Sequence, residues 1–286
     1  MKKKKITQDK VVYFINYVLL ALLLVIVLYP IIYIISCSFS SGSALMAGRV
    51  RLLPVEFTFD SYKAVFKYQS IWSGYKNSVI YTIVGTLISI VFTLFAAYPL
   101  SRDDFRGQKL FTGLFLFTMM FSGGLIPTYL LVRNLKLIDT MWAIVLPGAV
   151  SAYNMIVART FFKQTIPKEL MEAAEMDGCS DFKFFSRIVI PLSTPIVAVL
   201  CLWVAVSLWN SYFNPMIYIN SEDKYPLQLV LRRILLMSQV NLNSSSVDPQ
   251  VIAKNQYLSE MLKYGTIIIS TLPLMVIYPL VQKYFV

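Results

Sequence analysis

The charged residues of this chain leave long intervals with no ionisable side chain, and each interval is rich in apolar residues. The first runs from Lys10 to Arg49. Each interval can hold a transmembrane helix, which needs about 20 mostly apolar residues to cross the hydrocarbon core of a bilayer. The pattern predicts an all-α, polytopic membrane protein. We expect about six transmembrane helices, near residues 12–36, 77–100, 109–132, 140–161, 188–210 and 264–283.

Prolines are expected to interrupt these spans, because a proline removes a backbone N–H and clashes with the preceding helical turn. The positions concerned are Pro127, Pro147, Pro191, Pro195, Pro273 and Pro279. Such breaks suit the lining of a transport pathway, although proline and glycine are also simply commoner in membrane helices than in soluble ones.

Composition agrees with a membrane protein, since 57% of the 286 residues are hydrophobic and 14% are charged. We expect a single membrane domain over residues 1–286. An N-terminal tail, the first span and an outer loop occupy 1–76, and the core occupies 77–286. The apolar run from Val11 to Ile35 is too long for a cleaved signal peptide, so it stays as a helix.

Five lysines, at positions 2 to 5 and 10, precede the first span and predict a cytoplasmic N-terminus. Six spans then return the C-terminus to the cytoplasm and place the loop 162–187, with Cys179, on the same side. The net charge of +11 indicates attraction to anionic lipid head groups. No basic and aromatic module for nucleic acid is visible, so no nucleic-acid partner is expected.

Several chemistries are excluded by absent residues. The chain has no histidine, which rules out His-containing zinc sites and Ser-His-Asp catalysis. Apart from Lys109, Arg159 and Lys283 near span ends, the predicted spans contain no Asp, Glu, Lys, Arg or His. This disfavours proton coupling but leaves sodium coupling open. No phosphate-binding G-x-x-x-x-G-K-[ST] loop is present. We therefore expect no catalytic residue, metal or cofactor, and any energy from ATP has to come from another protein.

The loop 162–187, called the acidic loop below, contains the sequence "EAAEMDGCSDFKFF" from Glu172 to Phe185. Pro167 is suited to the first turn of a short helix, and Gly178 to a left-handed stop at its end. Ser180 or Asp181 can cap a second helix that runs into the membrane as far as Pro191. The sequence thus predicts a helix, a glycine turn and a second helix.

We expect the apolar side of the short helix to consist of Leu170, Ala173, Ala174 and Met176. A helix of this length is marginal alone, so it has to pack against another surface. The alternative is an amphipathic helix on the lipid interface. Such helices are usually basic, whereas residues 169–177 hold four acidic side chains and no basic one.

The run Glu172-Ala173-Ala174, Gly178, Ile188, Ile190 and Pro191 resembles the E-A-A-x-x-x-G-x9-I-x-L-P loop of binding-protein-dependent ABC importer permeases. The spacing agrees throughout, and Ile190 in place of leucine is the one departure. In that family the loop carries a cytoplasmic coupling helix that docks on an ATPase subunit. The resemblance, over roughly 77–283, implies an ATPase-coupling role for Glu172, Ala173, Ala174, Asp177, Gly178, Ile188 and Pro191.

The stretches "IPKELMEAAEMDG", "RIVIPLSTP" and "WNSYFNP" are similar to the carbohydrate branch of the family, the maltose-type and polysaccharide-type permeases. The resemblance implies a second homologous permease, two ATP-binding cassette subunits, an extracytoplasmic solute-binding protein and a carbohydrate substrate. It also implies that the tail 282–286 reaches the ATPases, and that the chain lies in a bacterial cytoplasmic membrane.

Saccharides are held by aromatic faces and neutral hydrogen-bonding groups. Candidates for such contacts are Tyr153, Asn154, Trp209, Asn210, Tyr212 and Asn214. The alternative reading of the aromatic residues is an interfacial belt, and that of the asparagines is helix capping or interhelical bonding.

The outer segment 211–262 is long, and we interpret it as a docking surface for the solute-binding protein, with a plain linker as the alternative. Two other functions remain open. One is a self-sufficient carrier or channel, which has no need of the acidic loop. The other is an importer permease for a solute other than a sugar.

Overall fold

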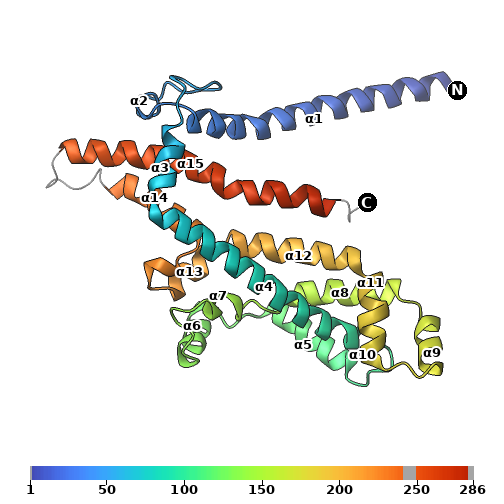
Figure 1. The fold of residues 1–286 in the computed structure, drawn as a ribbon. Coiled ribbons are helices and arrows are strands. Elements are labelled where there is room, and N and C mark those ends of the chain that lie inside the picture. Colours follow the sequence, from blue (N-terminus) through green and yellow to red (C-terminus); the bar gives the residue numbers. More distant parts are fainter. Residues whose placement is uncertain (1, 241–248, 283–286) are drawn as a thin grey trace. The chain divides into compact units, whose positions relative to one another are not determined.

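The computed structural model describes residues 2–240 and 249–282, which form helices joined by turns and irregular segments (Figure 1). No strand occurs within these two ranges, so the predicted all-α class is confirmed. The chain separates into two compact units. One holds residues 1–69 and 233–271, and the other holds 70–232 and 272–286. The single domain expected from the sequence stays a prediction.

The first unit is built around the end of the N-terminal helix. Its elements are α1 (Lys2–Ser38), α2 (Gly42–Met46), α3 (Asp60–Lys67), the end of α14 (Leu227–Val240) and most of α15 (Pro249–Gln282). Cys37, Ala44, Val50 and Tyr264 form its small core. The most apolar stretch of α1, within Lys10–Ser38, has no buried residue, as expected of a helix that faces lipid or another subunit.

The second unit carries the remaining elements. They are α4 (Gln69–Ser101), α5 (Gln108–Met120), α6 (Leu125–Asn134), α7 (Trp142–Val145), α8 (Ala152–Thr165), α9 (Lys168–Met176), α10 (Asp181–Phe184), a π-helix η1 (Phe185–Val189), α11 (Ile190–Leu192), α12 (Thr194–Trp209), α13 (Phe213–Tyr218) and a 3₁₀ turn η2 (Glu222–Lys224). The beginning of α14 and the end of α15 also belong to this unit.

Its core joins the second half of α4 to α8, to the α10–η1 segment and to α12. The buried residues there are Ile90, Leu94, Ala97, Leu100, Met155, Ala158, Phe162, Phe184, Phe185, Val189, Ile196 and Leu200. Near the other end of α4, a β-carbon on Gly74 would lie only 3.2 Å from Cα of Leu227. The missing side chain therefore lets two backbones approach, and the Ser78 hydroxyl accepts the Leu227 N–H at 2.9 Å.

Three helices are long and apolar enough to cross a membrane within the described ranges: Lys10–Ser38, Gln69–Ser101 and Gln256–Pro279. Two bent helix pairs raise this number to five if each pair is one span. The fourth predicted span, 140–161, is divided between α7 and α8 by residues 146–151, which contain Pro147 and Gly148. The count of six therefore stays a prediction.

The bends have local causes. The pair α5 and α6 turns by 114° at residues 121–124, where Gly124 has φ +83°. The second pair consists of the segment Asp181–Leu192, which includes α10, η1 and α11, and of α12. It turns by 80° at Ser193, between Pro191 and Pro195. Just before it, the Ile190 N–H donates to Phe185 O in a π turn. In contrast, Pro273 and Pro279 lie inside α15, so the expectation that they interrupt a helix was wrong.

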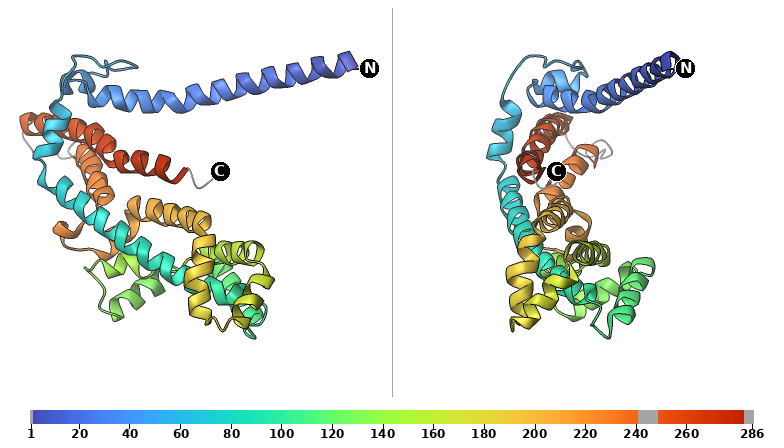
Figure 2. Two further views of the ribbon diagram at one scale, coloured as in Figure 1. Left: turned by 45° about the vertical axis from the view of Figure 1, so that its right-hand side comes forward. Right: turned by 90° about the vertical axis from the view of Figure 1, so that its right-hand side faces the viewer.

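At one end of the second unit, α9 and α10 lie beside each other and are joined by a tight turn, as both Figure 1 and Figure 2 show. Phe184 and Phe185 anchor this helical pair in the core, because both side chains are buried against α4 and α8. The acidic loop is thus continuous with the packed interior, and its shape does not depend on α9 alone.

Candidate functional site

The acidic loop has the helix, glycine turn and second helix that the sequence predicts. Gly178 lies in the left-handed region with φ +69°, and the Cys179 N–H donates to Ala174 O at 2.9 Å to close α9. Ser180 caps α10 by accepting the Lys183 N–H. Pro167 lies one residue earlier than predicted, at the N-cap of α9. Its ψ of 144° is extended and not helical, so the helix begins at the next residue.

The expected apolar side of α9 needs correction. Met171 and Ala174 pack against the core, but Leu170 and Ala173 are exposed and Met176 is 89% exposed. The packed face is therefore narrow. It follows the line of Met171 and Ala174 and excludes Leu170 and Met176, so α9 presents apolar side chains together with carboxylates to its surroundings.

The remaining candidate residues of the loop divide between the surface and the core. Glu172 and Asp177 are exposed and make no ion pair with any residue in the described ranges. Ile188 packs partly against the core, and Pro191 lies exposed on α11. The carboxylates of Glu172 and Asp177 thus remain available to a cationic partner surface.

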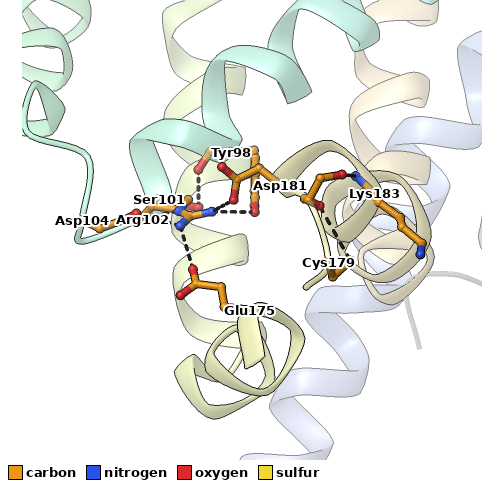
Figure 3. A network of polar contacts seen from close by, with 9 residues as sticks. Tyr98, Ser101, Arg102, Asp104, Glu175, Cys179, Asp181 and Lys183 are labelled. Atoms are coloured by element: carbon orange, nitrogen blue, oxygen red, sulfur yellow. Dashed lines mark hydrogen bonds and ion pairs between the residues drawn. The ribbon is translucent and has the colours of Figure 1, made fainter. Parts of the chain in front are cut away.

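Another acidic side chain of α9, Glu175, extends toward the turn that follows α4 and is 57% exposed. Glu175 Oε1 lies 3.3 Å from the Arg102 guanidinium, which also binds Asp104 at 2.7 Å and forms an ion pair with Asp181 at the start of α10 (Figure 3). The Arg102 side chain is only 12% exposed. One cation therefore joins three carboxylates from three segments of the chain.

The neighbouring Asp103 carries a second pair of contacts. Its carboxylate lies 2.8 Å from Lys163 Nζ at the end of α8 and 2.5 Å from Lys168 Nζ at the first residue of α9. These two lysines, Lys163 first, lower the pKa of Asp103 to about 2. The hydrogen bonds that Arg102 donates to Asp104 in turn raise the pKa of the Arg102 guanidinium. Both residues therefore stay charged through the physiological pH range.

A separate cavity of about 310 Å³ lies between α4, the 144–154 segment and α12. The polar side chains on its wall are Ser89, Ser151, Asn154, Ser207, Ser211 and Asn214. None of the described residues that line it is charged, and the ring of Trp203 adds an apolar face. The Ser89 hydroxyl is buried and has no hydrogen-bond partner in the described ranges. The cavity thus offers neutral hydrogen-bonding groups beside an aromatic surface.

Two of the six predicted sugar-contact residues, Asn154 and Asn214, share this cavity. Tyr153 is half-exposed and stands against Trp203 with ring centroids 5.9 Å apart. The other three lie elsewhere. Trp209 is buried edge-on against Tyr75, Tyr212 lies under the Arg232 guanidinium, and Asn210 is the exposed C-cap of α12.

The outer segment has an ordered beginning. The Asp139 carboxylate accepts the backbone N–H groups of Asn220 and Ser221 at 3.0 and 2.9 Å, and it binds Lys224 Nζ at 2.7 Å. From the other side, Tyr81 donates to Lys224 O at 2.9 Å. Lys224 and the Ser221 hydrogen bonds hold the pKa of Asp139 well below its usual value. Residues 241–248, within the predicted docking segment, lie outside the described residues.

Sequence reasoning missed Arg102, Asp103 and Asp139 as organising residues. None of the three was singled out as a candidate site residue. The cluster Arg102-Asp103-Asp104, with both signs of charge directly after a span, was the available signal. Its partners lie about 60 to 80 positions away in sequence, and no local pattern identifies them.

Comparison with known proteins is consistent with this geometry. Residues 70–286 match the family model described as the binding-protein-dependent transport system inner membrane component. Protein LplC of Bacillus subtilis is 39% identical over 260 residues, covering 91% of this chain and 86% of LplC. The polygalacturonan/rhamnogalacturonan transport system permease protein YtcP of the same species is 36% identical, covering 94% and 93%.

A solved structure also matches. It is the crystal structure of a bacterial ABC transporter involved in the import of the acidic polysaccharide alginate. One of its chains superposes with a TM-score of 0.88 at 38% sequence identity, covering 98% of each chain.

We predict that Asp139→Asn loosens the 218–227 segment, because the amide cannot form the ion pair with Lys224. Amide hydrogen exchange of residues 219–225 should become several-fold faster than in the unchanged protein. Since the folded pKa of Asp139 is lowered, its contribution is fully present above the unfolded pKa of about 4 and is lost progressively as pH falls from there through the lower folded pKa. Exchange in the unchanged protein, corrected for its intrinsic pH dependence, should therefore approach that of the variant in acid.

The matched control is Asp60→Asn, which removes an exposed ion pair with Lys63. It should leave exchange of 219–225 unchanged. Equal exchange of this segment in the Asp139 variant and the unchanged protein at neutral pH would refute the assigned role.

Proposed function

The chain belongs to the family of binding-protein-dependent transport system inner membrane components, and we propose that it is the transmembrane subunit of an ATP-driven importer for saccharides. The observation that carries this proposal is the exposed acidic helix α9, followed by the left-handed Gly178 and a second helix rooted in the core. A subunit that transports alone needs no such projection.

In this proposal α9 is the coupling helix. Its exposed carboxylates and apolar side chains, from Glu169 and Leu170 to Met176 and Asp177, dock on an ATP-binding cassette protein. Glu172 faces the partner, Ala173 permits a close approach of its backbone, and Gly178 sets the direction of the return helix. ATP hydrolysis belongs to separate subunits, because the family is the membrane component of such transporters.

The complete transporter then contains this chain, a second homologous permease, two ATP-binding cassette subunits and a solute-binding protein. The exposed apolar surface of α1 is consistent with packing against lipid or against a membrane helix of the second permease. The segment 211–262 receives the solute-binding protein, and Asp139 fixes its first part. The tail 282–286 was predicted to reach the ATPases, but residues 283–286 lie outside the described residues.

The lysines at the N-terminus support a cytoplasmic location for both termini and for α9. This orientation puts the coupling helix on the side where ATP is available. It puts the 218–227 segment on the opposite side, where a solute-binding protein delivers its cargo.

Saccharide cargo is supported by the neutral cavity that contains Asn154, Asn214 and Trp203. Hydroxyl and amide groups can exchange hydrogen bonds with sugar hydroxyls, and an indole face suits the apolar side of a sugar ring. YtcP is named as a permease of a polygalacturonan/rhamnogalacturonan transport system, and the similar solved structure is of a transporter involved in alginate import. We therefore propose an oligosaccharide or polysaccharide fragment. In this proposal the cavity of this chain forms hydrogen bonds with the hydroxyl groups of the saccharide. Any carboxylate groups of the saccharide are bound elsewhere in the complex.

A self-sufficient carrier or channel is not favoured, because it leaves α9 without a role. An importer for a non-sugar solute remains the closer alternative. Anionic amino acids or peptides would favour cationic groups or open helix N-termini along the path. The described lining of the cavity offers neutral groups instead.

We predict that the purified chain alone hydrolyses no ATP and that, expressed with its neighbours, it co-purifies with an ATP-binding cassette protein and a second permease. Membrane vesicles that contain only this chain should take up no oligosaccharide. Appreciable uptake by such vesicles would contradict the importer assignment.

We also predict that Glu172→Lys and Gly178→Leu each abolish ATP-driven uptake while the chain stays in the membrane. The first places a cation where the partner surface expects a carboxylate. The second opposes the left-handed turn by roughly 1 kcal/mol or more. Ser186→Ala, an exposed change on η1, is the control and should transport normally. Normal uptake by both loop variants would argue against coupling through α9.

A further inference from the structure

Arg102 and Asp103 are neighbours in sequence, yet their side chains hold opposite ends of α9. Asp103 binds Lys168, the first residue of the helix, at 2.5 Å. Arg102 binds Glu175, near the last residue, at 3.3 Å. The helix is therefore tied at two points, one near each end, to the turn that follows α4.

Arg102 also spans the glycine turn. Glu175 precedes Gly178 and Asp181 follows it, and the same guanidinium contacts both carboxylates (Figure 3). A planar guanidinium presents several N–H donors in a fixed fork, so it can bind carboxylates on different sides at once in a bidentate geometry that a lysine ammonium does not offer. The Arg102 side chain is only 12% exposed, whereas the carboxylates of Glu175 and Asp181 are 57% and 75% exposed. Water therefore screens these pairs from the carboxylate side, and their effect comes from one buried cation that holds several carboxylates together. The pairs fix the angle between α9 and α10.

The turn that receives these contacts is itself well held. Leu100 O accepts hydrogen bonds from Arg159 Nε at 2.7 Å and from Gln108 Nε2 at 3.0 Å, so α4, α5 and α8 meet there. From Ser101, α4 runs back to Ser89 on the wall of the polar cavity. Twelve residues of helix correspond to about 18 Å. A single continuous helix thus joins the turn that holds α9 to the wall of the cavity.

We propose that Arg102 and Asp103 are positioning residues that connect the coupling helix to α4, in addition to the covalent path through α10, η1 and α12. This inference rests on the proposed function for its consequence in transport. The placement of α9 and the glycine turn by Arg102 can be measured without any partner. Movement of α9 by an ATPase then pulls on both walls of the cavity, α4 through the ion pairs and α12 through the backbone.

The first experiment uses Cys179, which lies between Glu175 and Asp181 and is partly packed against the core. Cys37 and Cys201 are replaced by alanine, and the rate of Cys179 labelling by a maleimide is measured in the purified, detergent-solubilised chain. Arg102→Gln should raise this rate by about fivefold, because the turn opens locally when its ion pairs are lost. Arg102→Lys should restore part of the protection.

The matched control is Arg106→Gln in the same turn. Arg106 is exposed and forms no ion pair with any residue in the described ranges, so its removal should leave the labelling rate unchanged. Glu175→Gln should raise the rate, and the double variant with Arg102→Gln should show less than the product of the two effects. A rate that Arg102→Gln leaves unchanged, or raises no more than Arg106→Gln does, would overturn the proposal.

The second experiment reconstitutes the assembled transporter and measures oligosaccharide taken up per ATP hydrolysed. The Arg102→Gln complex should retain its ATPase subunits but show a several-fold lower ratio, with Arg102→Lys between it and the unchanged complex. An unchanged ratio would overturn the role in transmission. If the unchanged chain binds no ATPase, the proposed function falls, and the labelling experiment still decides whether Arg102 holds the turn.

Discussion

In a bilayer the backbone has no water to bond with, and this constraint explains both the straight and the broken parts of the chain. Helices satisfy their own N–H and C=O groups, so continuous segments such as α4 need no other support. Wherever a helix ends or bends, another group has to form the hydrogen bonds that the backbone N–H and C=O groups lose. The Ser78 hydroxyl does this for Leu227, and Arg159 and Gln108 do so for Leu100 O. The polar contacts gather at these breaks.

The same constraint separates rigid parts from surfaces available to partners. At one end of the second unit, Arg102 and Asp103 use charge to hold α9, leaving Glu172 and Asp177 exposed for another protein. In the 218–227 segment, Asp139 organises backbone groups that would otherwise lack partners. Between these polar clusters lie α4, α12 and the cavity with Asn154 and Asn214. The proposed import function needs this arrangement, because a conformational change driven by ATP hydrolysis in the partner subunits has to be transmitted through rigid helices to the saccharide-binding cavity.

Local patterns in the sequence predicted the helical class and the shape of the acidic loop, whereas the number of spans stays a prediction. The helical class followed from charge-free intervals, and the acidic loop followed from Pro167, Gly178 and Ser180, each of which has a strong backbone preference. The exposure of Leu170 and Met176 could not be predicted, because it depends on how α9 is rotated against the core. Arg102 was missed for a related reason, since its partners Glu175 and Asp181 are distant in sequence. Helix periodicity describes one element and carries no information about ion pairs between elements.

The most direct test of the account is amide hydrogen exchange of residues 168–179 in the membrane-embedded complex, with the ATP-binding cassette subunits present and after they are stripped away. The account predicts slow exchange of these amides in the complete complex and faster exchange once the subunits are removed, with little change in the buried part of α4. Exchange that is equally fast in both states would show that α9 is not covered by an ATPase, and it would contradict the proposed coupling role.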